Sequence, residues 1–131
     1  MLRKPGVILA LCSVIVLLLA ACGTASNANP ASHSTENVVH MSSMQFVQSS
    51  ITIKKGESVT LVADTITTHI IANGTWEQGK AHPGAELGAP QVKDLQVAGN
   101  SSQAIGPFTT AGTFKLYCTI HSGMNLTVQV V

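Results

Sequence analysis

Three side chains that often bind metal ions lie within seven positions near the end of the sequence. Residues 117–126 read YCTIHSGMNL, in which Cys118, His121 and Met124 are spaced three apart. The flanking segments GTFKLYC and NLTVQVV alternate apolar and polar residues as strands do, which places the Cys118 thiol at the inward-facing end of a strand. His121 and Met124 then belong to a short loop between two strands. This arrangement predicts that the three side chains converge on one metal ion.

Each of these residues alone has a simpler explanation, since a methionine commonly fills a core and a cysteine commonly acts as a small hydrophobic residue. Their joint spacing favours a metal site. Thiolate, thioether and imidazole ligands together suit copper, whereas structural zinc sites usually take four cysteine or histidine ligands. A trigonal set of two histidines and one cysteine, with a weak axial methionine, is typical of copper that transfers electrons.

Such a set needs a second histidine, for which His40, His69 and His82 are the candidates. His69 precedes two isoleucines in a strand-like segment, so its backbone should be fixed by the core. His82 stands before a Pro-Gly pair in a loop, and His40 should face solvent from a half-buried strand. We therefore predict His69 as the second imidazole ligand.

The N-terminus indicates export. Arg3 and Lys4 precede an apolar run over residues 6–21, which is shorter than the roughly 20 residues that a membrane-spanning helix needs. The run ends in LAAC, which resembles the lipobox of bacterial lipoproteins, where lipid is attached to the cysteine after cleavage. We expect a signal peptide at 1–21 and lipidation of Cys22, with a plain signal peptide or an uncleaved anchor as the alternatives. The protein should then lie outside the cytoplasm, on the periplasmic or cell-surface side of a membrane.

Charge and cysteine content narrow the function further. Removal of residues 1–21 from the 131 leaves 110, with five lysines and no arginine against six acidic residues. Because no basic patch is present, nucleic acid is not an expected partner. Cys12 leaves with the signal and Cys22 takes the lipid, so Cys118 has no partner for a disulfide. A lone thiol in an oxidising compartment is expected to be buried or occupied by a metal.

The rest of the chain divides into a tether and one domain. Residues 22–37 contain no large apolar side chain and are expected to form a flexible tether. Residues 38–131 show about eight short β-type segments, which predict an all-β antiparallel sandwich or barrel. The expected segments are VVHM, MQFV, ITIKKGESVTLVA, THIIA, VKDLQV, SQAIGPF, GTFKLYC and NLTVQVV. A turn at Asn73–Gly74 should end one strand, and a long loop should follow over residues 75–90.

These segments together resemble the cupredoxins, the blue copper proteins that include plastocyanin and amicyanin. YCTIHSGM is similar to their copper loop, HIIANG to the segment with their upstream histidine, and MQFVQSSITIKKGESVTLV to their opening strands. The resemblance implies a Greek-key β-sandwich that holds one type 1 copper ion, with Cys118, His121 and the upstream His69 as equatorial ligands and Met124 as the axial ligand. Ile70 departs from the pattern, since the family often has an asparagine there that helps to hold the copper loop.

The resemblance also implies a function. The leading hypothesis is a monomeric, lipid-anchored carrier that moves single electrons between redox partner proteins and is not an enzyme. The alternative is a copper-binding protein for copper trafficking or tolerance without redox turnover, and a third hypothesis is a metal-free sandwich that binds protein or carbohydrate. A binuclear oxidase site would need a second cysteine in the loop, and multicopper enzymes need further histidine pairs, neither of which this sequence has.

Overall fold

The computed structural model describes residues 37–131, and this part of the chain consists of strands, turns and loops. The expected signal peptide at 1–21 and all but the last residue of the expected tether lie outside the described residues. Within residues 37–131 there are nine strands, one more than the sequence suggested: β1 (Val38–Met41), β2 (Ser50–Ile53), β3 (Val59–Ala63), β4 (His69–Glu77), β5 (Lys80–Pro83), β6 (Leu95–Val97), β7 (Ser102–Ile105), β8 (Gly112–Cys118) and β9 (Asn125–Val130). The described part contains no helix long and apolar enough to cross a membrane.

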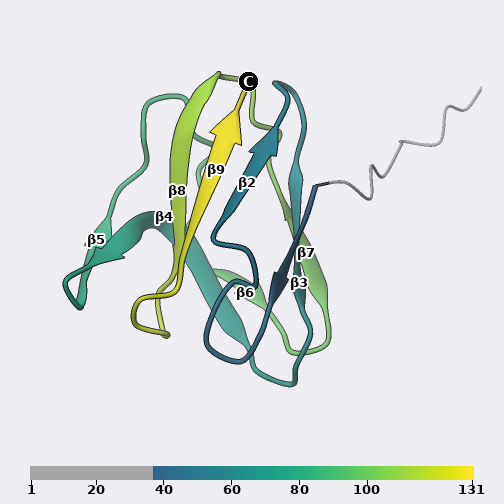
Figure 1. Cartoon of the computed structure of the whole chain (residues 1–131), viewed down its shortest axis with the longest axis vertical. Helices are drawn as coiled ribbons and strands as arrows, with labels where there is room; N and C mark the ends of the chain where they lie inside the picture. The colour runs from purple at the N-terminus through teal and green to yellow at the C-terminus, as the bar shows by residue number, and fades with distance from the viewer. Residues whose placement is uncertain (1–36) are drawn as a thin grey trace, which may run out of the picture. The chain divides into compact units, whose positions relative to one another are not determined.

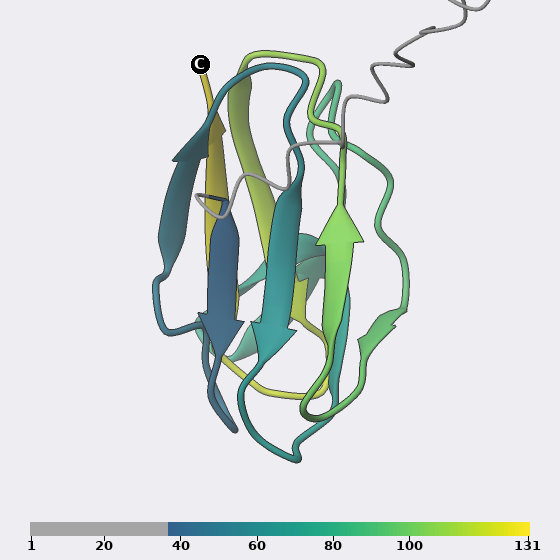
Figure 2. The same cartoon turned by 90° about the vertical axis from the view of Figure 1, so that its right-hand side faces the viewer.

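The strands form two sheets packed as a sandwich, as the sequence predicted (Figure 1). One sheet has the order β1-β3-β7, seen side by side in Figure 2, and the other has the order β2-β9-β8-β4-β5 with β6 also paired to β4. The β1–β3 and β2–β9 pairs are parallel, which corrects the expectation of an antiparallel fold at these two places. The reason is that β1 and β2 follow each other in the chain but join different sheets, so neither closes a hairpin with its neighbour.

The core lies between the sheets and is formed by alternate residues of the strands. Phe114, Leu116 and Cys118 of β8 are each at most 2% exposed, as the alternation predicted. The corresponding buried residues of β3 and β9 are Val59, Leu61, Ala63, Leu126, Val128 and Val130. Burial of a large apolar side chain contributes about 1.5–3 kcal/mol, so Phe114 and Leu116 firmly anchor the strand that ends at Cys118.

Residues 44–47 do not form the strand that the sequence predicted. They make only an isolated bridge between Met41 and Phe46, because a backbone hydrogen bond from Ser42 closes a turn directly after β1. Phe46 alone reaches the core, at 5% exposure, while Met44 is 63% exposed. The turn therefore breaks the alternation before a strand can form.

Strand β4 does not end at Asn73–Gly74, where the sequence predicted a turn, but continues to Glu77. The hairpin turn is formed by Gln78 and Gly79, whose φ angles of 51° and 76° suit a two-residue turn between twisted strands. Strand β5 then pairs with the extension of β4. Part of the predicted 75–90 loop is thus a β-hairpin, which projects beside β8 (Figure 1).

Asn73 and Gly74 instead make contacts with other segments of the fold. The buried Asn73 amide donates to the Pro90 carbonyl (3.2 Å) and accepts from the Val92 N–H (2.6 Å), so it holds the chain beyond the hairpin. At Gly74, with φ +133°, a β-carbon would clash with the His82 carbonyl oxygen and would lie 2.8 Å from Cα of Pro83 on β5 and 2.9 Å from the Tyr117 ring. Glycine is required there by the close approach of neighbouring strands rather than by a turn.

Candidate metal centre

Strand pairing brings His69 to the end of β8. Strands β4 and β8 are antiparallel, with Ile71 opposite Cys118. His69 lies two residues before Ile71 and so shares its inward face, just beyond the end of β8. Both His69 and Cys118 are fully buried. The loop 119–124 leaves β8 at this point, at the end of the sandwich opposite the C-terminus (Figure 1).

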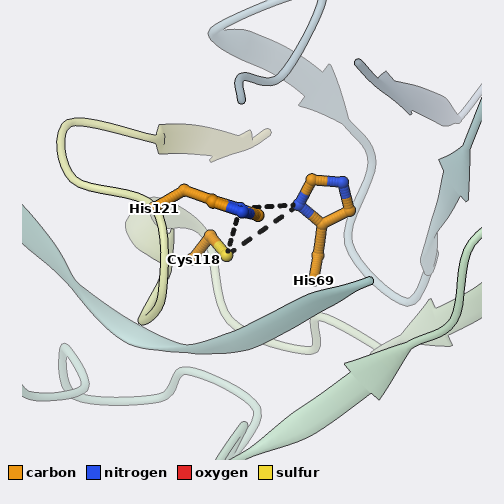
Figure 3. A group of neighbouring side chains, drawn as sticks. All are labelled: His69, Cys118 and His121. Atoms are coloured by element: carbon orange, nitrogen blue, oxygen red, sulfur yellow. Dashed lines mark hydrogen bonds between the residues drawn. The ribbon is translucent and has the colours of Figure 1, made fainter. Parts of the chain in front are cut away.

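His69, Cys118 and His121 point toward one another (Figure 3). The Sγ atom of Cys118 lies 3.3 Å from Nδ1 of His121 and 3.9 Å from Nδ1 of His69, and the two Nδ1 atoms are 3.2 Å apart. The imidazole rings meet edge to face at an interplanar angle of 67°. Each residue therefore directs one donor atom at a common point.

The size of this triangle fits a metal ion. The point equidistant from atoms separated by 3.2, 3.3 and 3.9 Å lies about 2.0 Å from each of them, and metal bonds to nitrogen and sulfur measure about 2.0–2.3 Å. The donor set of one thiol and two imidazoles is also the equatorial set of electron-transfer copper. Geometry and ligand chemistry thus agree.

Met124 is the fourth residue predicted for the site. It is 1% exposed, and its carbonyl accepts a hydrogen bond from the N–H of Cys118 (3.0 Å). Its own N–H donates to the carbonyl of His121 (3.2 Å). The backbone of Met124 is therefore tied to both loop residues of the donor triangle.

The loop is also held to β4, despite the isoleucine at position 70. The backbone N–H of Thr119 donates to the carbonyl of Ile70 (2.8 Å), and its hydroxyl donates to the same oxygen (3.3 Å). Backbone and a threonine side chain therefore make this connection, so a polar side chain at position 70 is not needed for it.

Burial keeps His69 in the form that binds metals. Desolvation lowers the pKa of His69, and the neighbouring charge of His121 lowers it further, while the backbone carbonyl of Ser42 has the opposite effect. The imidazole is therefore neutral near pH 7, as a metal ligand must be. Its Nε2 atom is buried and makes no hydrogen bond within the described residues. Nδ1 is thus the ring nitrogen of His69 that faces other polar atoms, namely Sγ of Cys118 and Nδ1 of His121.

The other two candidate histidines lie outside this cluster. His40 is exposed, and its Nδ1 pairs with the carboxylate of Asp64 at 2.8 Å. His82 is exposed on β5, opposite Thr75 of β4. The preference for His69 on grounds of burial therefore agrees with the geometry.

Two residues near the site were not anticipated from the sequence. The indole N–H of Trp76 donates to the carbonyl of Cys118 (2.8 Å), and the side chain of Asn125 bonds to the backbone of Trp76. The sequence predicts a loop at Trp76, because the Asn73–Gly74 pair before it is typical of a turn. Only the pairing of β4 with β5 shows that it lies beside the site.

Comparison with known protein families shows which family this chain belongs to. The model of the copper-binding proteins of the plastocyanin/azurin family matches residues 33–131. The chain belongs to this family. The cupredoxin resemblance inferred from the sequence is thereby confirmed.

Solved structures similar to this cupredoxin include amicyanins. The amicyanin of Paracoccus versutus (Thiobacillus versutus) is 24% identical, with 75% of this chain and 83% of that chain covered and a TM-score of 0.56. An oxidized amicyanin mutant is 21% identical over 73% and 82% of the two chains, with a TM-score of 0.56. A reduced Cu(I) form of another amicyanin mutant is 21% identical over 72% and 80%, with a TM-score of 0.55. These likenesses show the fold, and no curated protein matches the chain significantly.

Copper is thus the metal of this cupredoxin, as the ligand chemistry predicted. The donor triangle and the adjoining methionine have the arrangement of a type 1 copper site. The role of each residue as a ligand stays a prediction, for which substitutions provide the test.

Proposed function

We propose that this chain is a lipid-anchored carrier of single electrons between extracytoplasmic redox proteins. The convergence of Sγ of Cys118 with Nδ1 of His69 and His121 is the observation that carries the proposal. These three residues would hold the copper ion, with Met124 as the fourth, weaker ligand. Bound copper supplies the one-electron oxidation and reduction.

The restraint on the donor atoms favours electron transfer over storage of copper. Electron transfer is fastest when ligands move little between the two oxidation states, which requires ligands on a fixed backbone. Cys118 and His69 come from paired strands, and the backbone of Met124 is bonded to Cys118 and His121. Two of the three donor residues therefore lie in the core, and the third lies on a short loop whose backbone is bonded to the end of β8.

The end of the sandwich that carries the copper loop offers a docking surface. The connections at this end include residues 42–49, 64–68 and 119–124 (Figure 1). Each presents an exposed apolar side chain: Met44 at 63%, Ile66 at 86% and Ile120 at 53%. His121 is partly exposed in the same loop as Ile120. A partner that docks here approaches the imidazole edge through a mostly uncharged surface.

Electron self-exchange tests this proposal without a known partner. Mixed oxidised and reduced copies of the chain should exchange electrons rapidly, as seen by NMR line broadening. Because the docking end carries few charges, we expect the rate to change by less than about twofold between low salt and about 0.15 M salt. A steep dependence would implicate the scattered lysines and acids. Absence of exchange, with copper instead passed to a chelating acceptor, would support the trafficking alternative.

Membrane attachment through Cys22 is a separate part of the proposal. The Cys22→Ser variant should not receive lipid, because serine lacks the sulfur that is acylated. We expect it to accumulate as the unprocessed precursor or to be released, as judged by mass spectrometry and detergent partitioning. If the variant still enters the detergent phase at the mature mass, lipid is attached elsewhere or the anchor is not a lipid.

A further inference from the structure

Trp76 connects the β4–β5 hairpin to the metal centre. It is the only tryptophan of the chain, and its indole packs edge to face on Tyr117 with ring centroids 6.0 Å apart. Its Nε1–H donates to the carbonyl oxygen of Cys118 at 2.8 Å. A side chain from a segment outside the copper loop thus bonds directly to the backbone of the thiol ligand.

Asn125 holds Trp76 in this position. Its Oδ1 accepts from the Trp76 backbone N–H (2.7 Å), and its Nδ2 donates to the Trp76 carbonyl (2.9 Å). Asn125 directly follows Met124, whose carbonyl bonds to the N–H of Cys118. Together with the peptide bond between Met124 and Asn125, these hydrogen bonds form a closed circuit through Cys118, Trp76, Asn125 and Met124.

The segment that carries Trp76 is fixed at further points. The N–H of Gly84 donates to the carbonyl of Asn73 (3.1 Å), and the Glu86 carboxylate accepts from the N–H of Lys115 on β8 (3.1 Å). The hairpin and the chain after it are thus tied to both neighbouring strands. Trp76 is held on a restrained backbone, as a residue that sets the position of another must be.

We propose that Trp76 is a positioning residue for the copper centre, held in place by Asn125; this inference rests on the proposed function. With the indole bond, both polar backbone groups of Cys118 are satisfied, its N–H by Met124 and its carbonyl by Trp76. The peptide planes on both sides of the thiolate are therefore fixed, which sets the direction of its Sγ atom.

The Trp76→Phe variant of the full chain tests the proposal. Phenylalanine keeps an aromatic ring against Tyr117 but lacks the N–H donor. We expect Cu(II) affinity, measured by competition with a chelator, to fall about 10- to 100-fold, as is typical when an outer partner of a ligand is lost. The visible band and the copper hyperfine splitting should shift in the same variant. Glu77→Gln, an exposed change at the next residue of β4, is the matched control and should alter none of these values.

A double-mutant cycle separates positioning from packing. If Asn125 acts through Trp76, the Asn125→Ala and Trp76→Phe losses should not add, because each breaks the same circuit. Additive losses would overturn the role of Asn125, and a Trp76→Phe protein with wild-type affinity and spectra would overturn the role of Trp76. If circular dichroism shows Trp76→Phe to be unfolded, Asn125→Ala alone must shift the spectra, or the proposal is wrong. A colourless wild-type protein would instead defeat the proposed function, independently of these variants.

Discussion

The Cys118→Ser variant should remain colourless when Cu(II) is added, while the wild-type chain becomes intensely coloured. The visible band of a type 1 site arises from charge transfer between thiolate and Cu(II), and serine cannot supply a thiolate. We also expect Cu(II) affinity to fall more than about 100-fold, beyond the usual effect of losing an outer partner. Absorption spectroscopy and chelator competition measure the two effects.

The sequence supplies a matched control for this substitution. Cys22→Ser also replaces a thiol, but at the predicted lipid site outside the described domain, so it should keep the full band. Circular dichroism and thermal unfolding should show that Cys118→Ser is folded, because Cys118 is fully buried and serine has a similar size. An intense band in the folded Cys118→Ser protein would show that another residue binds the copper.

Substitution of His69 should have the second large effect. His69→Ala removes a fully buried imidazole whose Nδ1 lies 3.2 Å from that of His121 and 3.9 Å from the thiol. We expect loss of the narrow hyperfine pattern of type 1 copper in the electron paramagnetic resonance spectrum, with Cu(II) affinity again lowered more than about 100-fold. Copper bound to the remaining donors should give the wide splitting of an ordinary Cu(II) site.

The chain offers two histidine controls for this result. His82→Ala and His40→Ala change exposed side chains, on β5 and at the Asp64 pair, and both should keep the type 1 signal. Each of the three variants loses one imidazole, so they differ only in the position of the histidine that is replaced. Loss of the signal in His82→Ala would mean that the hairpin folds over the metal, contrary to the geometry.

The donor triangle could be predicted because local patterns determine it. The alternation of apolar and polar residues in β8 predicts that Cys118 points inward. Only two residues separate Cys118 from His121, so His121 lies just beyond it in the loop. The position of His69 could be predicted from a different signal. The isoleucines that follow it indicate a buried strand, which fixes its backbone. These local patterns do not predict the register of β4 against β8, which the structure shows to place Ile71 opposite Cys118.

The hairpin could not be predicted because its signals are ambiguous. Asn-Gly commonly marks a turn, but Gly74 here meets the close backbone of β5, and Asn73 bonds to residues far along the chain. The φ angles that select the true turn at Gln78–Gly79 depend on the pairing of β4 with β5. For the same reason, the position of Trp76 beside Cys118 depends on contacts that are distant in sequence.

The parallel pairs were missed for a topological reason. A short connection usually joins antiparallel neighbours, and the sequence between β1 and β2 is short. The turn after Met41 instead leads the chain from one sheet to the other, where β2 pairs with β9. The local alternation of apolar and polar residues does not indicate which sheet a strand joins.

The visible spectrum of the purified chain with one equivalent of Cu(II) is the most direct test of the central claim. A thiolate held by strand β8 beside two imidazoles should give an intense charge-transfer band and a narrow hyperfine pattern. Ascorbate should bleach the colour, and reoxidation should restore it with one electron per copper ion. A protein that binds no copper, or that binds it without colour, would contradict the assignment of a type 1 site.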